Sequence, residues 1–278
     1  MGRLFTARFL LLGAALALLP AAPAWAGTED VFPDVASAYL VLIDNHETWS
    51  HRANFRLPPA SLTKIMTVLL ALEHGRLQDS VTVSRRAASE IGTRLGLRAG
   101  ERYRAADLLA ATLLQSANDA CHALAEHLAG SELAFVAQMN RRAGELGLSD
   151  THFTNACGHD DPLHYSSAHD LARLAEAALA QPIFSGLASR VEASISTLDG
   201  RRHFRLVNKN ELVGRYPGAI GVKSGYTPKA GKCLVAYIRR NETTAMAVLL
   251  NAPDRWWTAA AMLDRAFAET RTLQAGAH

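Results

Sequence analysis

Strand-like segments lie near both ends of this chain, with a helical stretch between them. Residues 37–44 are apolar and β-branched enough for a buried strand, and residues 233–252 predict a two-strand hairpin. Residues 105–146 are mostly helical, with a break at 116–119. Strands this far apart in sequence bury their apolar faces most simply in one shared sheet. The sequence therefore predicts an α+β fold, in which helices flank a mostly antiparallel sheet and the middle of the chain forms a helical lobe.

Turn and capping residues predict the remaining elements. Pro58-Pro59 introduces a helix over residues 60–74, and Gly75 suits the C-terminal cap of that helix. The helical middle also breaks at Gly130-Ser131. The further predicted elements are a returning hairpin strand at 52–55, a strand at 81–83, a helix capped by Ser167 and Asp170 that ends near 180, a hairpin turning at Asp199-Gly200, a strand at 219–227 and a final helix at 254–270.

The first 26 residues have the pattern of a signal peptide. Arg3 and Arg8 give a basic start, residues 9–19 form a short apolar core, and Ala24-Trp25-Ala26 is a small-x-small cleavage site. The apolar run is too short for a comfortable membrane span, which makes an uncleaved anchor the weaker alternative. We expect an exported protein with a mature start near Gly27, soluble in the periplasm or another extracytoplasmic compartment.

Composition and charge exclude several classes of protein. The chain has 278 residues, of which 49% are hydrophobic and 20% charged, as in ordinary globular proteins. Without Arg3 and Arg8, 27 basic residues stand against 26 acidic ones, and no stretch is strongly basic. A nucleic-acid partner therefore has no electrostatic support. Since the sequence contains no linker, repeat or low-complexity stretch, residues 27–278 are expected to form a single domain.

The three cysteines are Cys121, Cys157 and Cys233. Three cysteines cannot all pair within one chain, and these form no C-x-x-C motif. Export permits disulfides, but the odd count argues against a disulfide framework. We expect buried free thiols.

Ser61 and Lys64 stand three residues apart at the start of the predicted 60–74 helix, so they share one face. The first turn of a helix gathers free backbone N–H groups and positive potential. A serine hydroxyl becomes a good nucleophile when a base removes its proton. A buried lysine can be that base, because burial and nearby cations favour its neutral form. Alone, the pair equally fits a helix cap beside a solvated charge.

Ser116 and Asn118 interrupt an apolar helical run, within "QSANDA" at residues 115–120. Small polar residues favour turns and caps over helix interiors, so a hydroxyl and an amide are expected in a turn between two buried helices. The hydroxyl can relay a proton, and the amide can donate to a substrate carbonyl and accept from its N–H. The alternative is that Ser116 only caps the second helix.

The segment "GVKSGYT" at residues 221–227 supplies a cation, Lys223, and a hydroxyl donor, Ser224. Gly225 lets another backbone approach, which suits a strand that receives an extended peptide. The backbone N–H of Tyr226 could face a developing oxyanion together with that of Ser61. The alternative is an exposed edge-strand lysine that discourages aggregation. The three segments together predict a site for acyl transfer in a cleft between sheet and lobe.

With these segments in order, the sequence resembles the serine D,D-peptidases among the low-molecular-mass penicillin-binding proteins, which share a fold with serine β-lactamases. The family motifs S-x-x-K, S-x-N and K-[TS]-G match residues 61–64, 116–118 and 223–225. The flanking sequences "PPASLTKIMT" and "GRYPGAIGVKSGYTPKAGKCLVA" are also similar, and the likeness runs from about residue 37 to residue 267. It implies a β-lactamase/transpeptidase-like fold.

The resemblance implies a penicillin-sensitive serine D-alanyl-D-alanine carboxypeptidase that acts on peptidoglycan stem peptides and needs no metal or other cofactor. Ser61 would attack the carbonyl between the last two D-alanines, and Lys64 would accept the Ser61 proton. Ser116 would pass a proton to the departing D-alanine. Water would then hydrolyse the acyl-enzyme, and β-lactam antibiotics would inhibit the enzyme by trapping Ser61.

The resemblance also implies a set of substrate-binding residues. Asn118 would hold the peptide amide, and Lys223 and Ser224 would bind the terminal carboxylate. Gly225 and Tyr226 complete this set, through the close backbone approach and the oxyanion contact described above.

The sequence departs from the family pattern in three places. Ser224 stands where threonine is more common and keeps the hydroxyl, and Cys157-Gly158-His159 replaces a Pro-His-Gly-type loop. Many members carry a second, β-rich domain and an amphipathic membrane helix, whereas this chain stops soon after the 254–270 helix, so neither is expected. It resembles the shorter soluble members, some of which are D,D-endopeptidases that cut cross-links, and that activity stays an alternative. Arg255 and Lys209 either assist the carboxylate or form surface ion pairs.

Three other interpretations fit the sequence less well. A class A-like β-lactamase has Asp in the second motif, where this chain has Ala117, and an additional Glu that "THFTNACGHDDPLHY" does not offer. A non-catalytic wall-binding protein would be free to lose Ser61, Lys64 or Lys223, all of which are present. A metal site would need ligands at a compact spacing in the sequence. The candidate ligands here lack such a spacing, and a polar loop accounts for their presence: His152, His159, Asp160, Asp161, His164 and His169.

Overall fold

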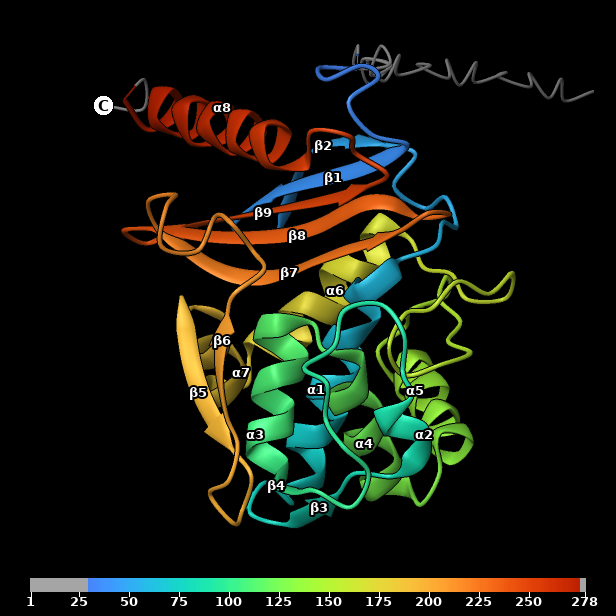
Figure 1. Cartoon of the computed structure of the whole chain (residues 1–278). Coiled ribbons are helices and arrows are strands. Elements are labelled where there is room, and N and C mark those ends of the chain that lie inside the picture. Colours follow the sequence, from blue (N-terminus) through green and yellow to red (C-terminus); the bar gives the residue numbers. More distant parts are fainter. Residues whose placement is uncertain (1–29, 276–278) are drawn as a thin grey trace, which may run out of the picture.

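A five-stranded antiparallel sheet joins the two ends of the chain in the computed structural model, which describes residues 30–275 (Figure 1). The predicted signal peptide, residues 1–26, lies outside the described residues. The strand order is β2-β1-β9-β8-β7, so β1 pairs with β9 from the other end of the chain. The strands are β1 (Ala38–Ile43), β2 (His46–His51), β7 (Ala219–Thr227), β8 (Gly231–Arg240) and β9 (Thr243–Leu250).

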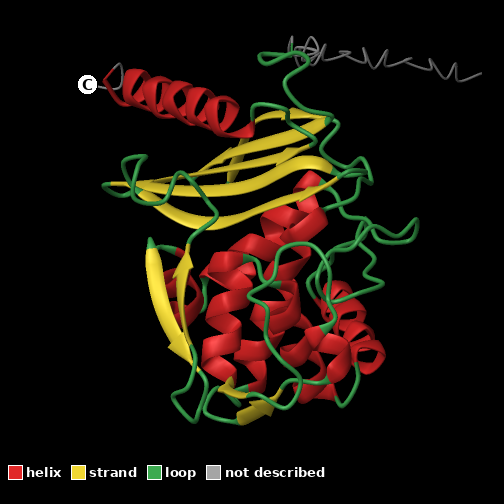
Figure 2. Ribbon diagram, viewed as in Figure 1, coloured by secondary structure: helices red, strands yellow, loops and turns green. Residues whose placement is uncertain are grey.

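The two faces of the sheet are covered by different helices (Figure 2). Because side chains alternate along a strand, Tyr39 and Val41 pack on one side with α8 (Arg255–Ala275), and Leu40 packs on the other. On that second side α6 (Ala168–Leu179) lies against β1, β8 and β9 and connects the sheet to the helical lobe. The architecture is therefore α+β, an antiparallel sheet with flanking helices, as the sequence predicts.

The helical lobe is built around α1, whose residues Ile65, Met66 and Leu69 are fully buried. This helix packs against α4, α5 and α6. Two small two-stranded sheets, β3–β4 and β5–β6, lie at the margins of the lobe (Figure 1). The bounds are α1 (Lys64–His74), α2 (Arg85–Ala88), α3 (Ala105–Ala110), α4 (Asn118–Ala129), α5 (Glu132–Glu145), α7 (Pro182–Ala188), β3 (Ser80–Thr82), β4 (Arg102–Arg104), β5 (Glu192–Ser196) and β6 (His203–Val207).

Local turn chemistry sets several boundaries as predicted. Gly75 ends α1 in the left-handed conformation, with φ 70°. The Ser167 hydroxyl caps α6 by accepting a hydrogen bond from the Asp170 N–H at 3.2 Å. The Asp170 carboxylate does not close the predicted capping box, because it accepts from the backbone N–H of Asp150 instead.

One predicted boundary is wrong. The strand that returns from β1 is His46–His51, not residues 52–55, because Asp44 and Asn45 take positive φ values and reverse the chain at once. The predicted helix at 60–74 is confirmed, although its first residues form a 3₁₀ turn, η1 (Ala60–Thr63), and the α-helix proper starts at Lys64.

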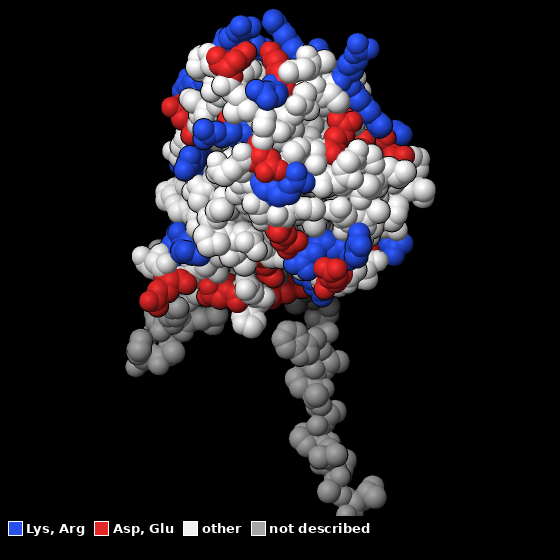
Figure 3. Space-filling model, turned by 90° about the horizontal axis from the view of Figure 1, so that it is seen from below, with Lys and Arg blue, Asp and Glu red and all other residues white. Residues whose placement is uncertain are grey.

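The surface carries a near balance of charge, in keeping with 29 basic and 26 acidic residues in the sequence. On the face seen in Figure 3, Lys and Arg side chains are interspersed with Asp and Glu. Within residues 30–275, no helix combines the length and the apolar character needed to cross a membrane.

Candidate active site

Turn η1 brings Ser61 and Lys64 into contact. Ala60 has a φ of 50°, in the left-handed region, and the chain then coils tightly into α1. The Nζ atom of Lys64 donates to the Oγ atom of Ser61 at 3.0 Å. Lys64 is fully buried whereas Ser61 is partly exposed, so the amine lies on the protein side of the hydroxyl.

The surroundings of Lys64 suit a base. Its Nζ also donates to Asn118 Oδ1 at 2.8 Å and to the carbonyl oxygen of Cys157 at 2.5 Å. Burial lowers the pKa of Lys64 to about 7, although the Glu90 carboxylate raises it in part. A neutral amine has two N–H groups and one lone pair, and the two carbonyl oxygens account for both N–H groups. The lone pair is then left for the Ser61 proton.

The interruption at Ser116 is a change of helical geometry. α3 passes into a π-helical turn, η2 (Ala111–Gln115), Ser116 takes a φ of 60°, and α4 starts at Asn118. The N-cap of α4 is Ala117, so the interpretation of Ser116 as a mere cap is wrong. Ser116 is buried. Such π-helical turns are frequent at functional sites.

The side chain of Asn118 bridges two walls of the site. Its Oδ1 accepts from Lys64, and its Nδ2 donates to the carbonyl oxygen of Ile91 at 2.6 Å. Its backbone N–H donates to the Thr93 carbonyl at 2.8 Å. Asn118 therefore joins α1 to the segment 91–93.

Asp119 has a role that the sequence did not reveal. Its fully buried carboxylate accepts from three successive backbone N–H groups, those of Leu95, Gly96 and Leu97, at 2.8–3.1 Å. It thus holds the loop before β4 against the start of α4. The available signal was an acidic residue in the first turn of an otherwise apolar helix, where free N–H groups gather.

Gly225 allows β7 to lie directly against η1. A Cβ atom on Gly225 would lie 2.9 Å from the Ser61 backbone nitrogen and 3.0 Å from the Ala60 Cβ. Only glycine fits at that distance without displacing a neighbour. The third motif is thereby placed beside the first.

Lys223 and Ser224 are buried on β7. The Lys223 Nζ donates to the Ser224 carbonyl at 2.9 Å, and the Ser224 hydroxyl donates to the Lys209 carbonyl at 3.2 Å. Burial, followed by the charges of Lys64, Arg255 and Lys209, holds the pKa of Lys223 well below its ordinary value. The alternative of a solvent-exposed edge lysine is wrong, because Lys223 is 2% exposed.

Arg255 reaches β7 from the start of α8. Its Nη1 donates to the Gly225 carbonyl at 2.6 Å and to the Cys233 carbonyl at 3.3 Å, and its guanidinium lies over the Trp256 ring. Within the described residues no carboxylate pairs with it, so the surface ion-pair interpretation does not hold for Arg255. Burial lowers its pKa.

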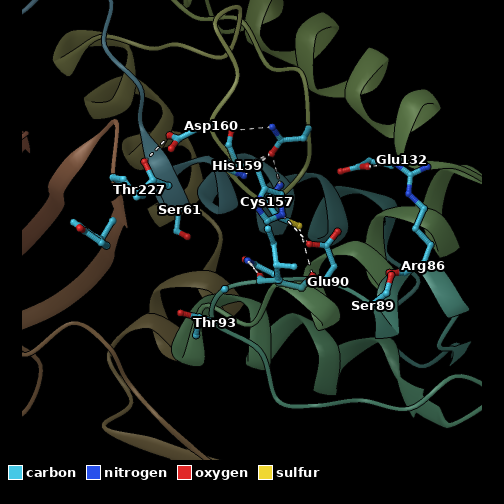
Figure 4. A pocket seen from close by; sticks show the side chains of 17 residues that line it. Ser61, Arg86, Ser89, Glu90, Thr93, Glu132, Cys157, His159, Asp160 and Thr227 are labelled. Atoms are coloured by element: carbon cyan, nitrogen blue, oxygen red, sulfur yellow. Dashed lines mark hydrogen bonds and ion pairs between the residues drawn. The ribbon is translucent and has the colours of Figure 1, made fainter.

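These segments surround one pocket of about 870 Å³ (Figure 4). Ser61 and Thr227 lie toward one end of the view, and Arg86 and Glu132 toward the other. Of the predicted site residues, the pocket is lined by Ser61, Asn118 and Tyr226. The other predicted residues are buried and do not line it: Lys64, Ser116, Lys223, Ser224 and Gly225.

Cys121 and Cys157 form a disulfide, so the expectation of three free thiols is wrong. Cys121 belongs to α4 and Cys157 to the loop at 155–160, and their Cα atoms lie 6.0 Å apart. The bond ties α4 to the loop whose Cys157 carbonyl accepts from Lys64. Cys233 is free and buried, and burial raises its pKa to about 11.

The histidines of the polar loop make separate hydrogen bonds. His164 lies between Thr63 and the backbone N–H of Thr154, and burial lowers its pKa to about 4. His159 bonds Glu90, and His169 pairs with Glu47. Among the residues with described positions, no group of three or more His, Cys, Asp or Glu side chains is arranged to hold a metal ion.

Known proteins are similar to this chain in both sequence and fold. The D-alanyl-D-alanine carboxypeptidase family profile, peptidase S11, matches residues 27–254. The D-alanyl-D-alanine carboxypeptidase DacF of Bacillus subtilis (strain 168) is 37% identical over 254 residues, which cover 88% of this chain and 65% of that protein. The chain thus spans slightly less than two thirds of this relative.

Solved structures agree with the sequence comparison. The crystal structure of a D-alanyl-D-alanine carboxypeptidase from Mycobacterium tuberculosis H37Rv matches with a TM-score of 0.80 and 32% identity, over 87% of this chain and 95% of that one. The Streptomyces K15 DD-transpeptidase matches with a TM-score of 0.79 and 28% identity, over 84% and 97%. The predicted family resemblance is confirmed: the chain belongs to peptidase family S11, the D-alanyl-D-alanine carboxypeptidases.

Proposed function

We propose that this protein is a serine D,D-carboxypeptidase that removes the terminal D-alanine of peptidoglycan stem peptides through an acyl-enzyme on Ser61. The contact between Lys64 Nζ and Ser61 Oγ, 3.0 Å long, carries this proposal, because the amine is buried and has a pKa of about 7. Near neutral pH a large fraction of Lys64 is then neutral and able to accept the Ser61 proton.

Acylation starts when Ser61 Oγ attacks the carbonyl carbon between the last two D-alanines while Lys64 takes its proton. The backbone N–H groups of Ser61 and Tyr226 are the proposed oxyanion donors, and the tight packing of Gly225 on the Ser61 nitrogen supports this pairing. The C–N bond then breaks. The buried Ser116 hydroxyl passes its proton to the departing amine, near Lys223, and receives in exchange the proton that Lys64 took from Ser61, which leaves Lys64 neutral again.

The substrate binds beside β7, which is an edge strand of the main sheet. An extended peptide can add to such an edge through main-chain hydrogen bonds. Lys223 and Ser224 bind the terminal carboxylate, with Arg255 and Lys209 adding positive potential, and Asn118 contacts the peptide amide. For that contact Asn118 shares its side chain with Lys64 and the Ile91 carbonyl.

Water completes the reaction by hydrolysing the ester on Ser61, with Lys64 again as the base. A β-lactam acylates the same hydroxyl, which is the basis of the proposed penicillin sensitivity. A D,D-endopeptidase that cuts cross-links would use the same nucleophile, and it remains the alternative. We also propose export by the predicted signal peptide and action outside the cytoplasm, in the periplasm or an equivalent compartment.

The proposal is tested by incubating the mature protein with a stem pentapeptide and, separately, with a cross-linked dimer. Mass spectrometry should detect the tetrapeptide and free D-alanine from the first substrate, and a fluorescent penicillin should label wild type but not Ser61→Ala. Cleavage of the dimer alone would favour the endopeptidase. A folded wild-type protein that reacts with neither peptide nor penicillin would refute both.

A further inference from the structure

Three ionisable side chains meet at the wall of the pocket and have no part in the proposed reaction. The Glu90 carboxylate accepts from His122 Nδ1 at 2.6 Å and from His159 Nε2 at 2.8 Å. A carboxylate only accepts, so both imidazole nitrogens must donate. Glu90 follows α2, His122 lies in α4 and His159 lies in the 155–160 loop, so the cluster joins three separate segments. Figure 4 shows the Glu90 and His159 members of the cluster.

The cluster places ionisable groups where they are mostly buried from solvent. The side chains of Glu90 and His122 are 12% and 1% exposed. Burial alone would raise the pKa of Glu90, but the two imidazole hydrogen bonds outweigh it and lower that pKa to about 2. Burial would lower the pKa of His122, but Glu90, Glu132 and Glu126 outweigh it and raise that pKa. The Glu90 carboxylate and a protonated His122 imidazole therefore stabilise each other.

The segment that follows Glu90 holds the side chain that contacts the proposed base. Ile91 and Thr93 both accept hydrogen bonds from Asn118, as described above, and Asn118 Oδ1 accepts from Lys64. Fixing Glu90 thus fixes the 91–93 carbonyls, which orient the Asn118 amide toward the Lys64 amine. The negative charge of Glu90 also acts directly on Lys64.

We propose that Glu90, clamped by His122 and His159, is a positioning residue for Lys64. Through the 91–93 segment and Asn118 it holds the amine on Ser61, and its charge favours the protonated amine, which the His122 imidazolium offsets. This inference rests on the proposed role of Lys64 as the base for Ser61. The charged groups that face the cluster from α1, α2, α4 and α5 are Lys64, Arg86, Glu126 and Glu132.

A purely structural role explains the cluster poorly. Buried ion pairs contribute little net stability, and apolar side chains of similar volume often replace them without loss. The carboxylate also lines the same pocket as Ser61 and Asn118. A charge that is costly to bury and that acts on the proposed base fits a role in setting the state of that base.

The test is the pH dependence of the second-order rate constant for acylation by a fluorescent penicillin. Glu90→Gln keeps the shape of the side chain and removes its charge. We expect the plateau rate to fall about tenfold, since the amine is held less well. We also expect the acid limb to move to lower pH, because a Lys64 without the nearby carboxylate loses its proton more readily. Glu90→Asp keeps the charge and should keep the wild-type acid limb.

His122→Gln removes the compensating cation, so its acid limb should move the other way, to higher pH. Glu101→Gln is the matched control. Glu101 is also a mostly buried carboxylate, paired with Arg202 outside the pocket, and its removal should leave the profile unchanged. Melting curves identify any variant that fails to fold.

The outcomes separate the two proposals. Failure of the wild type to react with penicillin would defeat the proposed function itself. A reactive wild type with an unmoved acid limb in folded Glu90→Gln would overturn only the positioning role of Glu90. Equal loss in Glu90→Gln and Glu90→Asp, again with the limb unmoved, would also overturn it, since that result indicates packing alone.

Discussion

The Lys64 amine lies 3.0 Å from the Ser61 hydroxyl, and three carbonyl or hydroxyl oxygens surround it. Each of these oxygens comes from a different segment, namely η1, α4 and the 155–160 loop. A base held in this way depends on its own protonation and on the packing of all three segments.

Acylation of Ser61 should rise with pH through an acid limb near pH 7. Below that pH Lys64 is protonated and has no lone pair, and above it the neutral amine accepts the Ser61 proton, in line with its pKa of about 7. Stopped-flow labelling with a fluorescent penicillin from pH 5 to pH 9 measures the limb. Lys64→Arg stays protonated throughout and should react about 10²–10⁴-fold more slowly. A rate that is flat across this range would contradict the role of Lys64.

Gly158→Ala should destabilise the fold and slow acylation. Gly158 has a φ of 87°, and an added Cβ would lie 2.0 Å from the Ala60 carbonyl oxygen, beside the nucleophile. Strain and overpacking together should cost about 2–5 kcal/mol, measured by urea unfolding. Gly144→Ala in α5 is the control, since its Cβ meets nothing within 4 Å and should stabilise by about 0.5–1 kcal/mol. Equal stability of the two variants would contradict the packing described for Gly158.

Reduction of the Cys121–Cys157 disulfide should lower the free energy of unfolding by about 2–4 kcal/mol, because it closes a loop over a sequence separation of 36. Acylation should slow as well, since the Cys157 carbonyl contacts Lys64. Thermal melts with and without a thiol reductant, together with thiol titration, provide the measurement. Cys233→Ala should respond to the reductant as wild type does. Three titratable thiols in the unfolded, unreduced protein would show that the bond is absent.

Lys223→Gln should abolish the preference for a free terminal carboxylate. A charge-assisted hydrogen bond contributes about 1.5–3 kcal/mol, so wild type should favour a D-Ala-D-Ala peptide over its amidated form by about 10- to 100-fold in kcat/KM. The variant should treat the two peptides alike. Ser224→Thr keeps the hydroxyl and should behave as wild type. A variant that still discriminates would place the carboxylate elsewhere.

The sequence predicted the parts of the site that depend on local spacing. Ser61 and Lys64 share a face because they are one helical turn apart, and Gly225 was predicted to admit a second backbone. Other elements could not be predicted because their residues are mostly polar. β2 is a polar edge strand, so its residues, His46–His51, lacked the alternation expected of a strand.

Pairing across the fold could not be predicted from one sequence. The bond between Cys121 and Cys157 depends on how α4 meets the 155–160 loop, and spacing alone does not fix that distance. Glu90 belongs to no motif of the sequence and stands in a stretch without a predicted element. Its role follows only from the approach of His122 and His159, which come from two other segments.

The pairing of Ala38 with Leu250 has a consequence for biogenesis. β1 is made first but cannot pair with β9 until residues 243–250 have been synthesised. Contacts between residues so far apart in sequence form slowly. The helical lobe can fold earlier from local contacts. Because β7 is made late in synthesis, the side of the pocket that β7 forms next to Ser61 is absent until then. A partly made chain should consequently lack the proposed activity, which should appear only when synthesis is nearly complete.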